Sequence, residues 1–96
     1  MLEMEQMERA QVLDALSALA SATRLDLLRA LVVSGDEGMP AGQIAALLGV
    51  SASRLSFHLM SLQQAGLVSA RRDGRNVIYT AEYRGLGGVI GYLLHD

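Results

Sequence analysis

The chain has 96 residues, enough for one compact domain and too few for two, and its 51% of hydrophobic residues predicts a folded core. It has no cysteine, which excludes disulfides, thiolate metal sites and cysteine nucleophiles, and no apolar run approaches the roughly 20 residues of a membrane span. A net charge of −2 argues against a protein that coats nucleic acid generally. Because the first residues also lack the basic start of a secretory signal, we expect one soluble domain in the cytoplasm.

Two helices are predicted in the first third of the chain. Residues 4–19 carry leucines at helical spacing, which is typical of an amphipathic helix. A broad apolar face follows in the next segment, where Ser21 or Thr23 begins a second helix. Residues 35–38, Gly-Asp-Glu-Gly, have the composition of a solvated loop and therefore end this helical pair.

The next two predicted helices are short and are joined by a tight turn. Pro40, the only proline, fits the first turn of a third helix, and Gly49 ends that helix. Ser51 then caps a fourth helix, which carries leucines inward and stops at Gly66. Two short helices around Gly-Val-Ser are typical of a helix–turn–helix, so we assign this motif to residues 40–65.

The hydrophobic pattern changes from helix to strand after the fourth helix. Two strand-like segments flank Asp73-Gly74, a pair that accepts the positive φ values of a tight hairpin turn, so residues 67–81 are predicted to form a wing. A last helix is predicted over residues 82–95, although glycines are unfavourable in helix interiors unless another backbone comes close. The glycines of this segment are Gly85, Gly87, Gly88 and Gly91.

Charge is distributed unevenly along the chain. Residues 1–50 have three arginines against seven acidic residues, whereas residues 51–84 have five arginines against two acidic residues. Every basic residue is arginine, whose forked guanidinium suits phosphate and guanine. A mildly acidic chain with a basic middle is compatible with a selective reader of double-stranded DNA.

Four stretches of the chain together resemble the ArsR/SmtB-type repressors of bacteria. They are Leu19–Leu31, Ile44–Leu62, Ala65–Val68 and Arg71–Tyr79, and the most specific part is Ser-Phe-His-Leu followed by Ala-Gly-Leu-Val. The resemblance runs over nearly the whole chain. It implies a single winged helix–turn–helix domain over residues 1–96, mainly α with a β-hairpin. It also implies a homodimer, built from the first and last helices, that leaves a partly palindromic operator when an inducer arrives.

The sequence departs from this family where metal-sensing members hold their inducer. The Cys-x-Cys type motif of the third helix is replaced by Met39–Gln43, and the Asp-x-His start of the last helix by Glu82–Arg84, with only His95 and Asp96 near its end. We therefore predict no metal site and no cofactor. The arsenite-sensing subgroup, closest in wording, carries a cysteine pair just beyond the last helix. Arsenite would be the first inducer to test if a cysteine-bearing tail is missing.

Ten residues of the helix–turn–helix and wing are predicted to contact DNA. They are Gln43, Ser51, Ala52, Ser53, Arg54, Ser56, His58, Arg71, Arg72 and Arg75. The fourth helix would face bases and phosphates in the major groove, and the wing arginines would reach the minor groove or flanking phosphates. Simpler alternatives are a solvated first turn, a surface glutamine at Gln43, a packing role for His58, and a charged hairpin that only prevents edge pairing.

The dimer interface is predicted on the first and last helices, about residues 4–20 and 82–95. Its apolar residues are Leu13, Leu16, Leu86, Val89, Ile90 and Leu93, with Met4 and Met7 as filler. The glycines of the last helix are expected to let the backbone of the partner approach closely. Two-fold symmetry of this kind is needed to read two half-sites.

Three other side chains have expected roles. Arg24 and Arg29 lie in the acidic half of the chain, so we expect them to pair with Asp26 or with neighbouring carboxylates. Phe57 is expected to pack, or to edge the DNA groove, rather than to stack on a base.

The leading functional prediction is a DNA-binding transcriptional regulator, acting as a dimeric repressor. The alternative is a winged-helix module that grips protein with the same helix and hairpin, but the polar start of the fourth helix favours DNA. An enzyme is not expected, because the sequence shows no paired carboxylates, nucleophile–base set or phosphate-cradling glycine loop.

Overall fold

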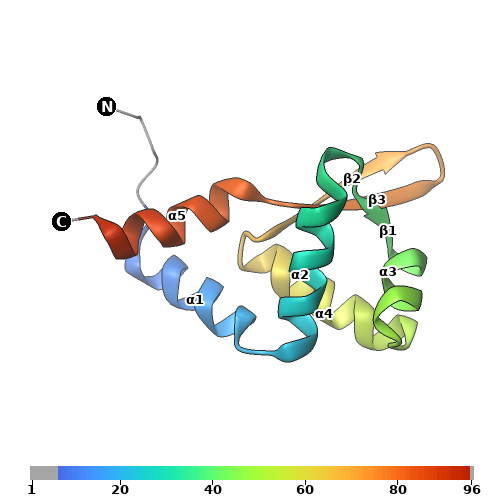
Figure 1. Cartoon of the computed structure of the whole chain (residues 1–96), viewed down its shortest axis with the longest axis horizontal. Coiled ribbons are helices and arrows are strands. Elements are labelled where there is room, and N and C mark those ends of the chain that lie inside the picture. Colours follow the sequence, from blue (N-terminus) through green and yellow to red (C-terminus); the bar gives the residue numbers. More distant parts are fainter. Residues whose placement is uncertain (1–6, 96) are drawn as a thin grey trace.

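Five α-helices, a short 3₁₀ turn and a three-stranded antiparallel sheet make up residues 7–95, the part of the chain that this computed structural model describes (Figure 1). In chain order they are α1 (Arg9–Leu19), α2 (Ala22–Ser34), η1 (Gly35–Glu37), β1 (Met39–Pro40), α3 (Ala41–Leu48), α4 (Ala52–Gln64), β2 (Val68–Asp73), β3 (Asn76–Ala81) and α5 (Tyr83–Leu94). This order confirms the predicted mainly α-helical fold with a β-hairpin.

The first helix begins later than the sequence predicted. Glu8 is extended, and its backbone N–H donates to the Gln11 side-chain oxygen at 2.9 Å, so the helix starts at Arg9. Residues 4–6 of the predicted helix, including Met4, lie outside the described residues. Met7, which was expected to fill a dimer interface, packs against the core of its own chain.

A two-residue strand that the sequence did not predict connects the helix–turn–helix to the wing. β1 pairs with β3, placing Met39 opposite Tyr79 and giving the sheet the order β1-β3-β2. Pro40 is therefore the last residue of β1 and the N-cap of α3, rather than a residue of the first helical turn. The loop before β1 passes so close to β3 that a Cβ on Gly38 would collide with the Tyr79 carbonyl oxygen.

The hairpin turn is displaced by one residue from its predicted place. Asp73 is paired with Asn76, so the two turn residues are Gly74 and Arg75 instead of Asp73 and Gly74. Gly74 has φ +66°, and no other residue type in the described chain has a positive φ. A positive φ at the first turn residue alone is the arrangement that places glycine there.

The core lies where α1, α2, α3 and α4 meet the base of the sheet. Its largest fully buried side chains are Leu27, Leu31, Ile44, Leu55, Leu62 and Leu67. Each buried side chain of this size contributes about 1.5–3 kcal/mol through the hydrophobic effect. Helix α1 turns small residues inward, with Ala15 fully buried, and leaves Leu13 and Leu16 outside.

These elements give the molecule two distinct ends. Helices α1 and α5 pack on each other at one end of a body that measures 42 × 26 × 19 Å (Figure 1). The start of α4, helix α3 and the tip of the hairpin lie at the other end. The predicted dimerisation helices and the predicted DNA-binding elements are thus separated along the longest axis.

Candidate nucleic-acid interface

The turn between α3 and α4 has the geometry of a helix–turn–helix. Gly49 caps α3 in the left-handed conformation, with φ +68°, and the Gly49 and Val50 N–H groups both donate to the Ala45 carbonyl, at 2.9 and 3.2 Å. The two helix axes turn through 109° at this point, within the range of about 90–120° for the motif. The predicted Gly49 turn and Ser51 cap are confirmed.

The sharp turn also bears on membrane insertion. Among the described residues, no single helix is long and apolar enough to span a bilayer. Helices α3 and α4 together would suffice by length and composition alone, but Ile44, Leu55 and Leu62 are buried in the core of the domain. The buried apolar residues of this pair therefore have a packing role in the fold.

The first turn of α4 presents an exposed polar surface. The Ser51 hydroxyl oxygen accepts the Arg54 N–H at 3.2 Å, so this side chain is engaged in capping the helix. Ala52, Ser53, Arg54 and Ser56 are all exposed. A helix N-terminus with free donors and an exposed arginine suits contacts with phosphates and base edges. The DNA contacts of these residues stay predictions.

His58 is joined to α2 through Arg24. The Arg24 Nε–H donates to His58 Nδ1 at 3.1 Å, so the expectation that Arg24 pairs with Asp26 or with a neighbouring carboxylate is wrong. Burial, together with the positive charges of Arg24 and Arg54, holds the pKa of His58 below its ordinary value. The imidazole is therefore neutral, and because Nδ1 accepts, its hydrogen is on Nε2. That nitrogen remains the donor for the predicted contact with DNA.

Phe57 lies on the outer surface of α4 and is not packed in the core. Its side chain is 60% exposed, and the Arg24 guanidinium lies over its ring at 5.5 Å from the centroid. The His58 ring approaches it edge-on, with 6.1 Å between centroids. Phe57 was expected to pack or to edge the DNA groove; the ring does pack against Arg24 and His58, and its contact with the groove stays a prediction.

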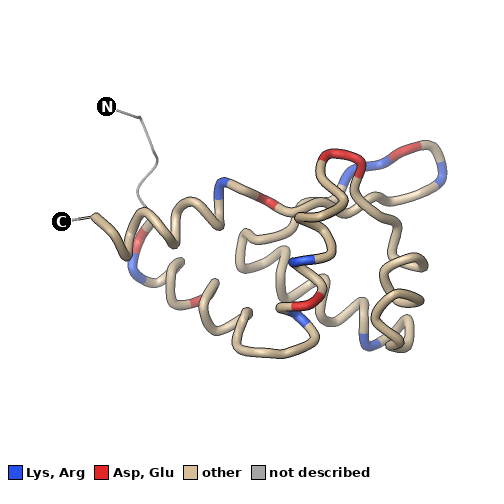
Figure 2. The backbone as a smooth tube through the Cα atoms, in the orientation of Figure 1, with Lys and Arg blue, Asp and Glu red and all other residues tan. Residues whose placement is uncertain are grey.

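The wing carries its arginines on an exposed hairpin. Figure 2 shows basic segments on β2 and at the hairpin turn, at the end of the molecule away from α1 and α5. Arg71 donates to the Glu37 carbonyl at 3.1 Å, so part of its guanidinium braces the 3₁₀ turn. Arg72 and Arg75 are exposed beyond it, near the tip. These two have the better geometry for the predicted contacts with DNA.

Gln43 stands apart from the other predicted contacts. It is exposed on α3 and lines a hollow of about 430 Å³ between α2 and α3, which it shares with Asp26, Arg29 and Glu37. Two carboxylates make this neighbourhood less favourable for phosphate than the start of α4. The surface-glutamine alternative therefore fits Gln43 better.

The predicted interface residues fall into two groups. Leu13, Leu16, Ile90 and Leu93 are 42–62% exposed, so their apolar area is available to a second protomer. Val89 is only 7% exposed and belongs to the core of its own chain, and Leu86 is half-buried against that core. The predicted role of Val89 at the interface needs correction, because little of its surface remains to be covered.

Two of the glycines in α5 allow close approach within the chain, not between chains. A Cβ on Gly85 would collide with the backbone of Gly66, and one on Gly88 would collide with the Met7 side chain. Gly91 faces open space. The expectation that these glycines serve a partner helix is therefore wrong for the first two and stays a prediction for Gly91.

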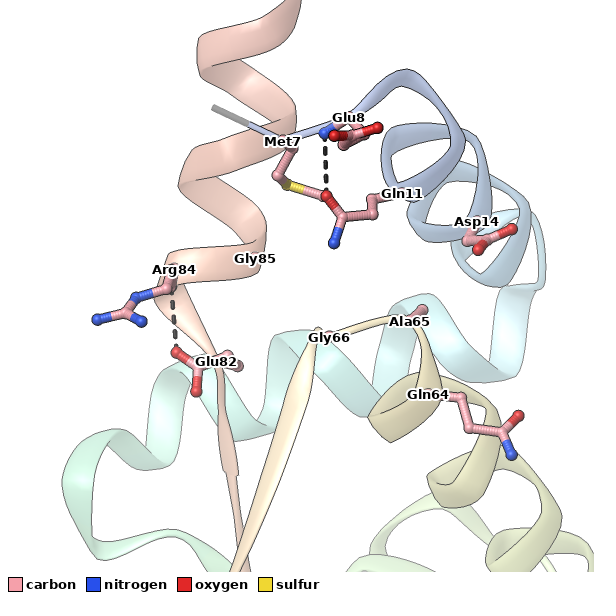
Figure 3. A pocket seen from close by; sticks show the side chains of 10 residues that line it. All are labelled: Met7, Glu8, Gln11, Asp14, Gln64, Ala65, Gly66, Glu82, Arg84 and Gly85. Atoms are coloured by element: carbon pink, nitrogen blue, oxygen red, sulfur yellow. Dashed lines mark hydrogen bonds between the residues drawn. The ribbon is translucent and has the colours of Figure 1, made fainter. Parts of the chain in front are cut away.

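A hollow of about 600 Å³, which sequence reasoning did not find, lies between α1, the end of α4 and the start of α5 (Figure 3). Glu8, Asp14 and Glu82 contribute its carboxylates. Glu82 accepts hydrogen bonds from the Ser69 hydroxyl at 2.8 Å and the Arg84 N–H at 3.2 Å, which hold the pKa of its carboxyl below the usual range.

Within residues 7–95, no three His, Asp or Glu side chains are grouped to hold a metal ion.

Comparison with known families and curated proteins identifies similar regulators. The family model for the helix–turn–helix domain matches residues 19–70. The transcriptional regulator YgaV of Escherichia coli is 31% identical over 78 residues, which cover 81% of this chain and 77% of that protein. The putative arsenical resistance operon repressor ArsR of Halobacterium salinarum is 41% identical over 70 residues, 73% of this chain and 54% of that protein. The chain thus spans between about half and three quarters of these relatives.

Solved structures show the same similarity. An ArsR-like transcriptional regulator from a Rhodococcus species has a TM-score of 0.78 and 31% identity, covering 88% of this chain and 76% of its own. A homodimeric winged helix–turn–helix DNA-binding domain from Mycobacterium bovis, a possible ArsR-family regulator, has a TM-score of 0.70 and 29% identity, covering 91% and 85%. The observed wing and helix–turn–helix therefore have counterparts in solved regulators.

Proposed function

Because this chain belongs to the ArsR family of winged helix–turn–helix transcriptional regulators, we propose that it is a homodimeric repressor that binds operator DNA in the cytoplasm and leaves it when an inducer arrives. The observation that carries the proposal is the separation of two surfaces. The exposed start of α4 and the arginine-bearing wing lie at one end, and the apolar helices α1 and α5 lie at the other (Figures 1 and 2).

The apolar end supports a dimer. Leu16 on α1 and Ile90 and Leu93 on α5 are exposed leucine and isoleucine side chains on two helices that pack together. Exposed apolar side chains on two helices that pack together support an interaction site at this end of the domain. The M. bovis structure with the same fold is homodimeric. A two-fold axis through this end would direct both helix–turn–helix motifs outward, toward successive half-sites.

The polar end supports DNA binding through two kinds of contact. Arg54 and the small residues around it enter the major groove, where an arginine discriminates guanine by paired hydrogen bonds. Arg72 and Arg75 contact phosphates or the minor groove beside it, and these contacts add affinity that depends on salt. The Nε2–H of His58 donates to a phosphate or a base edge.

If the inducer is a thiophilic ion, the ligands that bind it lie outside these 96 residues. The Halobacterium relative is a putative arsenical resistance repressor. This sequence has no cysteine, and soft ions need thiolates. We propose that a response to arsenite in this system would need cysteines beyond Asp96.

The test is to sequence genomic DNA fragments retained by the purified protein and to measure Kd for one retained fragment and one random fragment. Arg54→Ala should reduce discrimination between the two by about 1–3 kcal/mol. Arg72→Ala should weaken both complexes and lower the salt slope by about one per site. Arg29→Ala, which removes an exposed arginine from the acidic half, is the matched control and should change neither.

Two outcomes would contradict this proposal. If the wild-type protein shows no preference for any fragment, it is not an operator-binding regulator, and the protein-interaction alternative gains support. If Arg54→Ala weakens both complexes equally, Arg54 touches phosphate and does not read a base.

A further inference from the structure

The outward face of the recognition helix carries an apolar residue at its centre. Leu55, Leu59 and Leu62 of α4 are buried, with 0–2% of their surface exposed. A helix advances 100° per residue, so the face opposite these leucines carries Ser53, Phe57 and Met60. The aromatic ring therefore lies on the surface that a helix–turn–helix presents to the major groove, more directly outward than Arg54 or His58.

Phe57 and Met60 together place apolar area on this outward face of α4. The Phe57 side chain is 60% exposed, and Met60, one turn later, is 51% exposed. The side chain of Arg24 on α2 supports the Phe57 ring in this outward position. The Arg24 guanidinium lies 5.5 Å from the ring centroid, a distance at which a cation is attracted to the aromatic face.

Arg24 is itself held by a hydrogen bond to α4. Its Nε–H donates to His58 Nδ1 at 3.1 Å, and the His58 ring meets the Phe57 ring at an interplanar angle of 61°. Two side chains of α4 and one of α2 therefore hold each other. Less side-chain freedom remains to be lost when the exposed side of the ring meets a ligand.

We propose that Phe57 is a specificity-determining residue that contacts the C5 methyl group of a thymine in each operator half-site, with Arg24 as its positioning residue. In the major groove this methyl group distinguishes thymine from the other bases, and apolar side chains such as phenylalanine can recognise it by direct contact. The proposal rests on the proposed function, because it names what the same DNA-binding surface reads.

The experiment uses a retained operator fragment in which each thymine is replaced, one at a time, by deoxyuridine. This replacement removes the methyl group and keeps every hydrogen-bonding group. Removing one buried methyl-sized contact should weaken wild-type binding about fourfold at one thymine position of a half-site. Phe57→Ala should bind the unmodified operator more weakly and should show no further loss on the deoxyuridine fragment.

Two other variants separate positioning from general weakening. Arg24→Gln should reduce the fourfold deoxyuridine penalty, a readout that loss of a phosphate contact alone would not change. Leu47→Ala removes a side chain of α3 that is 61% exposed, close to the exposure of Phe57, and should leave the penalty at its wild-type value.

The outcomes distinguish this inference from the function on which it rests. If wild-type protein prefers the retained fragment but no deoxyuridine weakens binding, or if Phe57→Ala keeps the full penalty, the thymine contact is overturned and operator binding stands. If Phe57→Ala instead loses capture of a protein while its DNA binding is unchanged, the ring is a protein contact and the inference is also overturned. If wild-type protein binds no DNA, both fail.

Discussion

The carboxylate of Glu82 accepts a hydrogen bond from the Ser69 hydroxyl, with 2.8 Å between the two oxygens, and this bond joins the N-cap residue of α5 to the base of strand β2. The Glu82 N–H also donates to the Leu67 carbonyl at 2.9 Å, and the other carboxylate oxygen accepts the Arg84 N–H at 3.2 Å. One residue therefore connects the wing to the helix proposed for dimerisation (Figure 3).

The first prediction concerns acid stability. The hydrogen bond from Ser69, followed by that from the Arg84 backbone, lowers the pKa of Glu82 in the folded state. The stability this gives is complete above the ordinary carboxyl pKa and is lost as pH falls through the lowered folded-state value. Glu82→Gln should therefore flatten the acid decline of the unfolding free energy, by less than about 1 kcal/mol because solvent screens the site.

Urea unfolding at a series of pH values between about 3 and 7 measures this effect. Ser69→Ala should reproduce part of it. Asp36→Asn, on the exposed 3₁₀ turn, removes a carboxylate elsewhere and should retain the wild-type decline. An acid decline that is identical in Glu82→Gln and wild type would contradict the assignment.

The second prediction concerns His58. Burial is the largest cause of its lowered pKa, and the charges of Arg24 and Arg54 add to it. Arg24→Gln should raise the pKa part of the way toward the ordinary imidazole value, because burial remains. The stabilising Arg24 bond is fully present above that ordinary value and is lost as pH falls through the folded-state pKa. An NMR titration follows the His58 ring directly, and an unchanged His58 pKa in the variant would argue against the contact.

The third prediction compares two glycines of α5. Gly85→Ala should destabilise the fold by about 1–3 kcal/mol, since its Cβ would collide with the Gly66 backbone, which cannot move as a flexible side chain can. Gly91→Ala meets open space and should stabilise the helix by up to about 1 kcal/mol. Thermal unfolding of both variants provides the measurement. Equal stability of the two variants would show that Gly85 of α5 does not pack against the Gly66 backbone.

The fourth prediction tests the dimer. Ile90→Glu places a charge on an α5 side chain that is 57% exposed and should convert the dimer to a monomer, with a large loss of operator affinity. Val33→Glu introduces the same charge on α2, at a residue that is 82% exposed, and should remain dimeric. Sedimentation velocity distinguishes the two states. A wild-type protein that is monomeric at micromolar concentration and on DNA would remove the basis for this prediction.

The fifth prediction concerns metal ions. Zinc, cadmium or arsenite should not release operator DNA from the 96-residue chain at concentrations that act on thiolate sensors. Soft ions need thiolates, which this sequence lacks, and borderline ions need several converging imidazoles or carboxylates. Fluorescence anisotropy of a labelled operator complex reports release. Release by metal that His95→Ala abolishes would instead locate a sensor at the end of α5.

Local chemistry explains which features could be predicted from the sequence. Gly49 and Ser51 mark the helix–turn–helix because a left-handed cap and a hydroxyl N-cap each depend on one residue and its near neighbours. The start of α1 was predicted too early because its capping box begins with Glu8, where the common pattern has Ser or Thr. The turn at Gly74 was found to within one residue.

Contacts between distant segments explain the rest. Arg24 and His58 are 34 residues apart in the sequence, so the residues around Arg24 could not indicate that its hydrogen-bond partner is His58 and not Asp26. β1 is two residues long and exists only because β3 offers an edge to it. Apolar spacing assigned both Val89 and Ile90 to the dimer interface but could not separate Val89, which packs inward, from Ile90, which is exposed.

The short strand β1 fixes the spacing between the wing and the helix–turn–helix. Met39 is hydrogen-bonded into the sheet opposite Tyr79, and α3 begins two residues later without a linker. β1 therefore joins the wing directly to the helix pair α3–α4. The distance between the wing and the helix pair cannot change from one DNA to another unless the pairing of β1 with β3 is broken. Operators should therefore share one groove spacing, even where their base sequences differ.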